Sequence, residues 1–165
     1  MKTLGIISIL LSAAMLISSC DITETKKKYL PETDYSNFIQ CHENGKWDSL
    51  RVVKGLVGVW EWESYWCYWQ HIRWHVDSQS VVVIEFKADH TLEVKKNGVI
   101  IETATWKVYN VTMPWDFRVL TTPQIPLTLG MIHFCGNKLD FNLSHIDGCD
   151  RRFVRKPGYT GLRNR

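Results

Sequence analysis

Five of the eight tryptophans of this 165-residue chain lie between positions 60 and 74. At the two-residue period of a β-strand, Trp60, Trp62 and Trp66 share one face, and Tyr65 lies on the other. Aromatic side chains in such positions fill a core or, at a rim, stack on sugars and planar ligands. We expect Trp60 and Trp62 to fill an interior, and residues nearer the end of the strand to lie at a rim. The candidates for ligand binding are Trp62, Trp66, Tyr68, Trp74 and Trp106.

Groups that could carry catalysis or bind a metal are sparse. His71 and His75 are four residues apart and would share one face of a helix, as metal ligands can, but their aromatic and β-branched neighbours favour a loop. Glu61 and Glu63 lie on the expected outer face of a strand, where paired carboxylates are solvated. The sequence contains neither a G-x-S-x-G elbow nor a glycine-rich phosphate-binding loop. We therefore expect no enzyme activity, no metal and no cofactor.

Cys20 follows a segment typical of an export signal. Lys2 precedes an apolar run over residues 4–17, which is too short for a comfortable membrane span. The residues Ile17-Ser18-Ser19-Cys20 resemble the lipobox of bacterial lipoproteins, in which the cysteine thiol is lipidated before cleavage. The resemblance implies cleavage before Cys20, lipid attachment to Cys20, and anchoring in a bacterial membrane on its periplasmic or cell-surface side.

The other four cysteines are Cys41, Cys67, Cys135 and Cys149. An even number in an exported chain predicts two disulfides. A zinc site is the alternative, but no two of these cysteines are as close in sequence as in structural zinc motifs.

From residue 56 onward, β-branched and aromatic residues dominate, and turn residues recur about every ten positions. Asn97-Gly98 is the strongest hairpin indication, because both residues tolerate positive φ. No long helical period separates the strands. We therefore expect an all-β, eight-stranded antiparallel up-and-down barrel, with an open two-sheet sandwich as the alternative. The expected strands span residues 56–68, 80–87, 91–96, 99–109, 117–121, 127–135, 138–143 and 149–156.

This strand order predicts the disulfide pairing. In an up-and-down barrel the first and last strands close antiparallel, which makes Cys67 and Cys149 neighbours at the end where the first strand finishes. Cys41 precedes the first strand and Cys135 ends the sixth, so both lie at the opposite end. We expect Cys67–Cys149 and Cys41–Cys135, since the other pairings would have to span the barrel.

Three short motifs in this region resemble those of lipocalins and of the lipocalin-like domains of bacterial lipoproteins. Gly58-Val59-Trp60 is similar to their opening Gly-x-Trp strand. Residues 86–91 are similar to their F-x-x-D-G-T hairpin, with His90 in place of the glycine. The closing Phe153-Val154-Arg155 is similar to their last strand, whose arginine packs across the first-strand tryptophan. The resemblance implies an eight-stranded lipocalin-like barrel with Arg155 on Trp60, or Arg152 if the last strand is shifted by one residue.

The chain divides into four expected segments. Residues 1–19 form the signal peptide, residues 20–50 a lipidated cysteine and flexible tether that could contain a short helix, residues 51–157 the barrel, and residues 158–165 a polar tail. The 20 Lys and Arg against 17 Asp and Glu give a net charge of +3, without the clustered basic excess of a nucleic-acid-binding protein. We expect a monomer.

Two functions fit these features. The first is a lipid-anchored cell-envelope lipoprotein that binds a small apolar or amphipathic ligand in the barrel. The alternative is an envelope accessory protein with a filled barrel, whose aromatic rim contacts a glycan or a protein partner. A cavity at the open end would favour the first, and an interior filled by Trp60, Trp62 and Trp106 the second.

Overall fold

The computed structural model of the chain describes residues 32–67, 69, 72–76, 79–111 and 116–157. Strands predominate in these ranges, and two α-helices precede them. The expected signal peptide, Cys20, Tyr68 and the polar tail over residues 158–165 lie outside the described residues.

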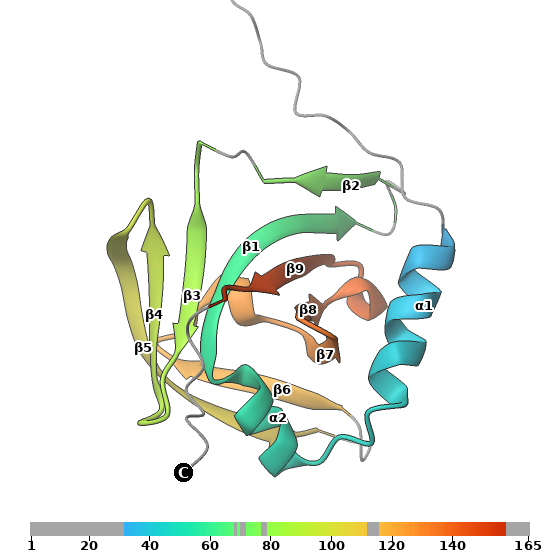
Figure 1. Ribbon diagram of the computed structural model, residues 1–165, viewed down its shortest axis with the longest axis horizontal. Helices are drawn as coiled ribbons and strands as arrows, with labels where there is room; N and C mark the ends of the chain where they lie inside the picture. Colours follow the sequence, from blue (N-terminus) through green and yellow to red (C-terminus); the bar gives the residue numbers. More distant parts are fainter. Residues whose placement is uncertain (1–31, 68, 70–71, 77–78, 112–115, 158–165) are drawn as a thin grey trace, which may run out of the picture.

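Eight antiparallel strands form a closed barrel (Figure 1). They follow one another around the barrel in chain order, and the last strand pairs with the first, so the sheet closes on itself. The predicted all-β up-and-down barrel is confirmed, and the sandwich does not form. The eight strands are β1 (Gly58–Cys67), β3 (Val82–Phe86), β4 (Thr91–Lys96), β5 (Val99–Asn110), β6 (Phe117–Thr122), β7 (Met131–Cys135), β8 (Lys138–Asn142) and β9 (Cys149–Arg155).

A further strand, β2 (Ile72–His75), was not expected from the sequence. It pairs with residues 64–67 of β1, whereas β3 pairs with residues 58–61. Because β2 and β3 both run antiparallel to β1 along the same edge, they are two pieces of one broken strand. The loop expected around His75 is therefore wrong, since pairing with β1 holds this segment extended. His71 lies outside the described residues.

Two of the expected hairpin turns contain residues with positive φ. Asn97 (φ 51°) and Gly98 (φ 82°) connect β4 to β5. His90, which stands where the resembling motif has glycine, adopts φ 65° between β3 and β4. The carboxylate of Asp89 accepts a hydrogen bond from the Thr91 N–H at 2.9 Å and stabilises this turn.

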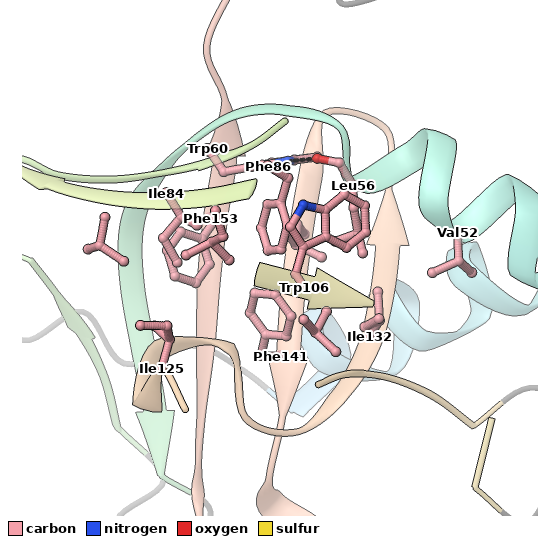
Figure 2. Close-up of a cluster of buried hydrophobic side chains, with 14 of the residues drawn as sticks. Val52, Leu56, Trp60, Ile84, Phe86, Trp106, Ile125, Ile132, Phe141 and Phe153 are labelled. Atoms are coloured by element: carbon pink, nitrogen blue, oxygen red, sulfur yellow. Dashed lines mark hydrogen bonds between the residues drawn. The ribbon is translucent and has the colours of Figure 1, made fainter. Parts of the chain in front are cut away.

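The interior of the barrel is filled with side chains (Figure 2). The largest of those less than 2 % exposed are Trp60, Phe86, Phe141 and Phe153, and Trp106 is only 3 % exposed. Phe86 packs edge-on against Trp106 with ring centroids 5.2 Å apart, and Phe141 packs edge-on against Phe153 at 5.8 Å. Such arrangements are the preferred contacts between aromatic rings.

Helix α2 (Ser49–Leu56) packs against the lower end of the barrel, where β1 begins (Figure 1). The Asp48 carboxylate caps its N-terminus by accepting a hydrogen bond from the Arg51 N–H. Val52 and Leu56, four residues apart, are completely buried in the barrel core. The first strand therefore begins at Gly58 rather than at residue 56, because the preceding residues use a helical period to cover the end of the barrel.

Trp60 and Arg155 connect this helix to the barrel. The Trp60 indole N–H donates to the Leu56 carbonyl at 2.7 Å. The Arg155 guanidinium lies 4.2 Å from the centroid of the Trp60 ring, the arrangement that the family resemblance implies, and donates to the carbonyls of Gly55 and Val57 at the end of α2. Burial lowers the pKa of Arg155. The pair thus joins β1, β9 and α2 through cation–π contact and hydrogen bonds.

Helix α1 (Glu32–Glu43) packs on the outside of the barrel, against β7. It lies in the segment expected to be a tether. Phe38 is 5 % exposed, and its ring lies against the guanidinium of Arg152. The Cζ atom of Arg152 is 4.2 Å from the centroid of the Phe38 ring. Arg152 in turn donates two hydrogen bonds to the buried carboxylate of Asp140. A buried ion pair therefore separates the helix from the barrel wall.

Both predicted disulfides are confirmed. Cys67 and Cys149 are direct partners across β1 and β9, with Cα atoms 4.2 Å apart. Cys41 of α1 and Cys135 at the end of β7 are joined with Cα atoms 5.5 Å apart. One bridge therefore closes the barrel at its upper end, where β1 finishes, and the other attaches α1. Two 3₁₀ turns, Pro126–Thr128 and Ser144–Ile146, complete the described elements.

Truncation of Trp60 should be strongly destabilising. Trp60→Ala removes a fully packed ring together with its hydrogen bond and its contact with Arg155, so we expect a loss of about 3–5 kcal/mol in the free energy of unfolding. Chemical denaturation followed by circular dichroism measures the change. Trp69→Ala is the control, since Trp69 is 55 % exposed, and should change stability by less than about 0.5 kcal/mol. Equal effects of the two variants would contradict this account of the core.

His42 should make the protein less stable in acid. Its Nδ1 accepts a hydrogen bond from the Phe134 N–H at 3.0 Å, and its ring lies 4.8 Å from that of His133. Burial, with His133 as a second cause, lowers the pKa of His42 from 6.5 to about 4. Between these values the unfolded chain binds the extra proton, so stability falls by about 2–3 kcal/mol as the pH drops from 6.5 to 4.

Denaturation series at several pH values measure this dependence. His42→Gln should flatten the slope between pH 6.5 and 4, because the side chain no longer titrates. His75→Gln, at an exposed histidine of β2, is the control and should retain the slope. A slope unchanged in the His42 variant would assign the acid sensitivity to other groups.

Candidate functional site

A β-bulge in β1 determines which aromatic side chains come together. Trp62 pairs with Phe153 of β9 and Ser64 pairs with the adjacent Arg152, so Glu63 is an extra residue on β1. An extra residue in one strand shifts every following side chain to the opposite face. After Trp62, the residues of β1 that the two-residue period assigns to the inner face therefore point outward, and those that it assigns to the outer face point inward.

The expected common face of Trp60, Trp62 and Trp66 is consequently wrong above the bulge. Tyr65, which was assigned to the outer face, lies beside Trp62 with ring centroids 6.1 Å apart. Trp66 follows Ser64, whose partner Arg152 lies against α1 on the outside of the barrel. The two-residue period cannot reveal an inserted residue, and nothing in the sequence marks the bulge.

Trp62, Tyr65 and Trp74 form a row of rings at the upper end of the barrel, which we call the aromatic ladder. Tyr65 and Trp74 are partners across β1 and β2, and their rings are stacked at 6.3 Å with an interplanar angle of 11°. Trp62 stacks on the core residue Phe153 at 6.5 Å and donates its indole N–H to the Ser64 carbonyl at 3.1 Å. All three ladder residues are partly exposed. The ladder thus extends from the packed core toward solvent.

The other aromatic candidates lie elsewhere. Trp66 is half-buried on the outer face, with Arg73 of β2 and Asp150 of β9 as its cross-strand partners. Trp106 lies in the core, where its indole N–H lies 3.2 Å from the carbonyls of both Lys87 and Thr91. Trp106 therefore contributes to packing near the β3–β4 turn rather than to a rim.

A cleft of about 350 Å³ opens in the barrel wall where the strand beside β1 is broken. Trp62 contributes to both this cleft and the ladder. Glu61 and Glu63 are partly exposed at the cleft, where Glu61 forms an ion pair with Lys156 and Glu63 lies 3.9 Å from the Lys138 ammonium. The lining residues are Glu61, Trp62, Glu63, Val76, Ser80, Val81 and Val154.

Asp150 has a structural role in the connection between β8 and β9. It is 3 % exposed, and its carboxylate accepts hydrogen bonds from the N–H groups of Leu143 and Ser144, the Ser144 hydroxyl and the Asn142 amide. Burial raises the pKa of Asp150 above its usual range. These bonds use both carboxylate oxygens to hold the β8–β9 connection in place.

The arrangement offers chemistry for binding. Ring faces stack on the C–H faces of sugars or on other flat groups, and carboxylates at the cleft accept hydrogen bonds from hydroxyl groups. Within the described part of the chain, no three His, Cys, Asp or Glu side chains are grouped as metal ligands would be.

Comparisons of the chain with protein-family models, with curated proteins and with solved structures gave no match. Among the described residues, none of the helices combines the length and the apolar character needed to cross a membrane.

Proposed function

We propose that the protein is a lipid-anchored accessory protein of the bacterial cell envelope that binds a glycan at its aromatic ladder. The observation that carries the proposal is the succession of three partly exposed rings, Trp62, Tyr65 and Trp74, above a barrel interior filled with side chains. The rings are available at the end of the barrel, and the interior is occupied.

The filled interior favours this function over storage of a small apolar ligand inside the barrel. Trp60 and Trp106 occupy the space that such a ligand would need, and Trp62 packs against the same core. A ligand in the barrel would have to displace these rings, and each large core side chain contributes several kcal/mol to stability. Binding at the rim has no such cost.

A glycan fits the ladder better than an apolar protein surface does. The ladder is narrow and is bordered by the charged residues Glu61 and Glu63 at the adjoining cleft. Protein interfaces are depleted in charged residues at their core, whereas sugars combine apolar C–H faces with hydroxyl groups that carboxylates can bind. The disulfide between Cys67 and Cys149 holds the end of β1, which lowers the entropy cost of ordering the rings on binding.

The anchor is the second part of the proposal. A lipid on Cys20 would hold the chain at the membrane, and stable anchoring requires more than one acyl chain. Residues 21–31 would then separate the lipid from α1, with a maximum reach of roughly 40 Å for the extended chain. The ladder would therefore operate close to the membrane surface.

Loss of a ladder ring should weaken glycan binding. Trp74→Ala removes the outermost ring of the stack, and we expect affinity to fall roughly tenfold, which corresponds to about 1.4 kcal/mol. A glycan array built from bacterial envelope polysaccharides identifies ligands of the wild type, and calorimetry then measures the affinity of each variant. Tyr109→Ala, at a 40 % exposed aromatic residue of β5, is the control. Absence of glycan binding by the wild type, or equal losses in both variants, would refute the proposal.

Substitution of Cys20 should release the protein from the membrane. Cys20→Ser removes the thiol that accepts the lipid, so we expect uncleaved precursor or a soluble form in place of the membrane-bound protein. Fractionation of expressing cells, together with labelling by a radioactive fatty acid, measures both consequences. Retention of label and of membrane binding by the variant would show that Cys20 is not the attachment site.

A further inference from the structure

One row of paired residues crosses five strands at the upper end of the barrel. Trp74 of β2 pairs with Tyr65 of β1, Tyr65 with Arg151 of β9, Arg151 with Phe141 of β8, and Phe141 with Ile132 of β7. Directly paired residues project to the same face of a sheet. Because Phe141 and Ile132 are completely buried in the core, the row belongs to the inner face, and Arg151 is its charged member.

Arg151 differs from the other two arginines of β9. Arg152 donates two hydrogen bonds to Asp140, and Arg155 donates to two carbonyls of the α2 end. In contrast, Nη1 of Arg151 is buried and has no hydrogen-bond partner. The adjacent Asp150 projects to the opposite face of β9, with its carboxylate engaged by the β8–β9 connection.

The buried Nη1 of Arg151, without a hydrogen-bond partner, is destabilising in this position. Burial lowers the pKa of Arg151, and the charge of Asp150 partly opposes this shift. An arginine in a protein nevertheless stays protonated at any physiological pH. A donor of a charged group that is buried without a hydrogen-bond partner loses its hydration and gains no bond in exchange. An anion that accepts a hydrogen bond from Nη1 would remove this cost. Tyr65 and Phe141, the cross-strand partners of Arg151 on either side, would exclude water from the contact between the guanidinium and the anion.

We propose that Arg151, with the ladder residues Tyr65 and Trp74, forms a subsite for the carboxylate of an acidic sugar. This inference rests on the proposed function and specifies its ligand class. Arg151 is only partly buried as a whole, and rotation of its outer side-chain bonds would bring the guanidinium toward the open end. There its planar fork can donate two parallel hydrogen bonds to a carboxylate, while the sugar ring stacks on Tyr65 and Trp74. A flat carboxylate fits between aromatic neighbours better than a tetrahedral phosphate or sulfate.

The test compares matched saccharides on the full-length protein. Uronic-acid oligosaccharides, neutral hexose oligosaccharides of the same linkage and length, and their sulfated forms are titrated by calorimetry. We expect the uronic acids to bind wild type at least tenfold more tightly than the neutral sugars. Arg151→Gln should abolish this preference, so that uronic acids and neutral sugars bind with similar affinity. Lys96→Gln, which removes one exposed positive charge from β4, is the matched control and should keep the preference.

A second readout separates binding from folding. Because Arg151→Met removes the buried Nη1 that has no hydrogen-bond partner, the melting temperature of this variant without ligand should equal or exceed that of the wild type, and uronic acids should no longer raise it. Equal binding of acidic and neutral sugars by the wild type would overturn the carboxylate subsite and leave glycan binding intact. Tighter binding of the sulfated forms would overturn the choice of carboxylate. Failure of every saccharide to bind would overturn both proposals.

Discussion

Pairing between β1 and β9 is the constraint on which the rest of the structure depends, because it closes the barrel. Trp60 and Arg155 secure the lower end of this pair, and the Cys67–Cys149 bridge secures the upper end. The same pairing places Arg155 against the last carbonyls of α2, which positions the helix that covers the core. Without closure, β1 and β9 would be edge strands with unpaired backbone groups.

Closure also determines which surfaces of the barrel remain accessible. Eight strands enclose an interior just wide enough for side chains, and aromatic rings from several strands occupy it. The accessible surfaces therefore lie at the ends of the barrel and on its wall. The broken strand beside β1 supplies one such surface, because the gap between β2 and β3 opens the cleft next to Trp62.

The charged groups of β8 and β9 differ in whether their hydrogen bonds are satisfied within the protein. Asp140 with Arg152 and Asp150 with the β8–β9 connection satisfy their hydrogen bonds within the protein, so each stabilises a particular contact. Their neighbour Arg151 has an unpaired nitrogen beside the exposed rings. Unpaired buried polar atoms are rare in native proteins, and functional sites are one place where they occur.

The sequence by itself determined the eight barrel strands, their order and the hairpin at Asn97-Gly98, because alternation and turn residues act locally. It also determined both disulfides, because an up-and-down strand order leaves few ways to pair four cysteines. Only the tertiary structure decided the rest. Residues 49–56 form a helix because the open end of the barrel offers Val52 and Leu56 a surface to cover. Tyr65 lies beside Trp62 because β1 has a bulge at Glu63 where it pairs with β9. A single inserted residue exchanges the two faces of a strand without any change in the local sequence pattern.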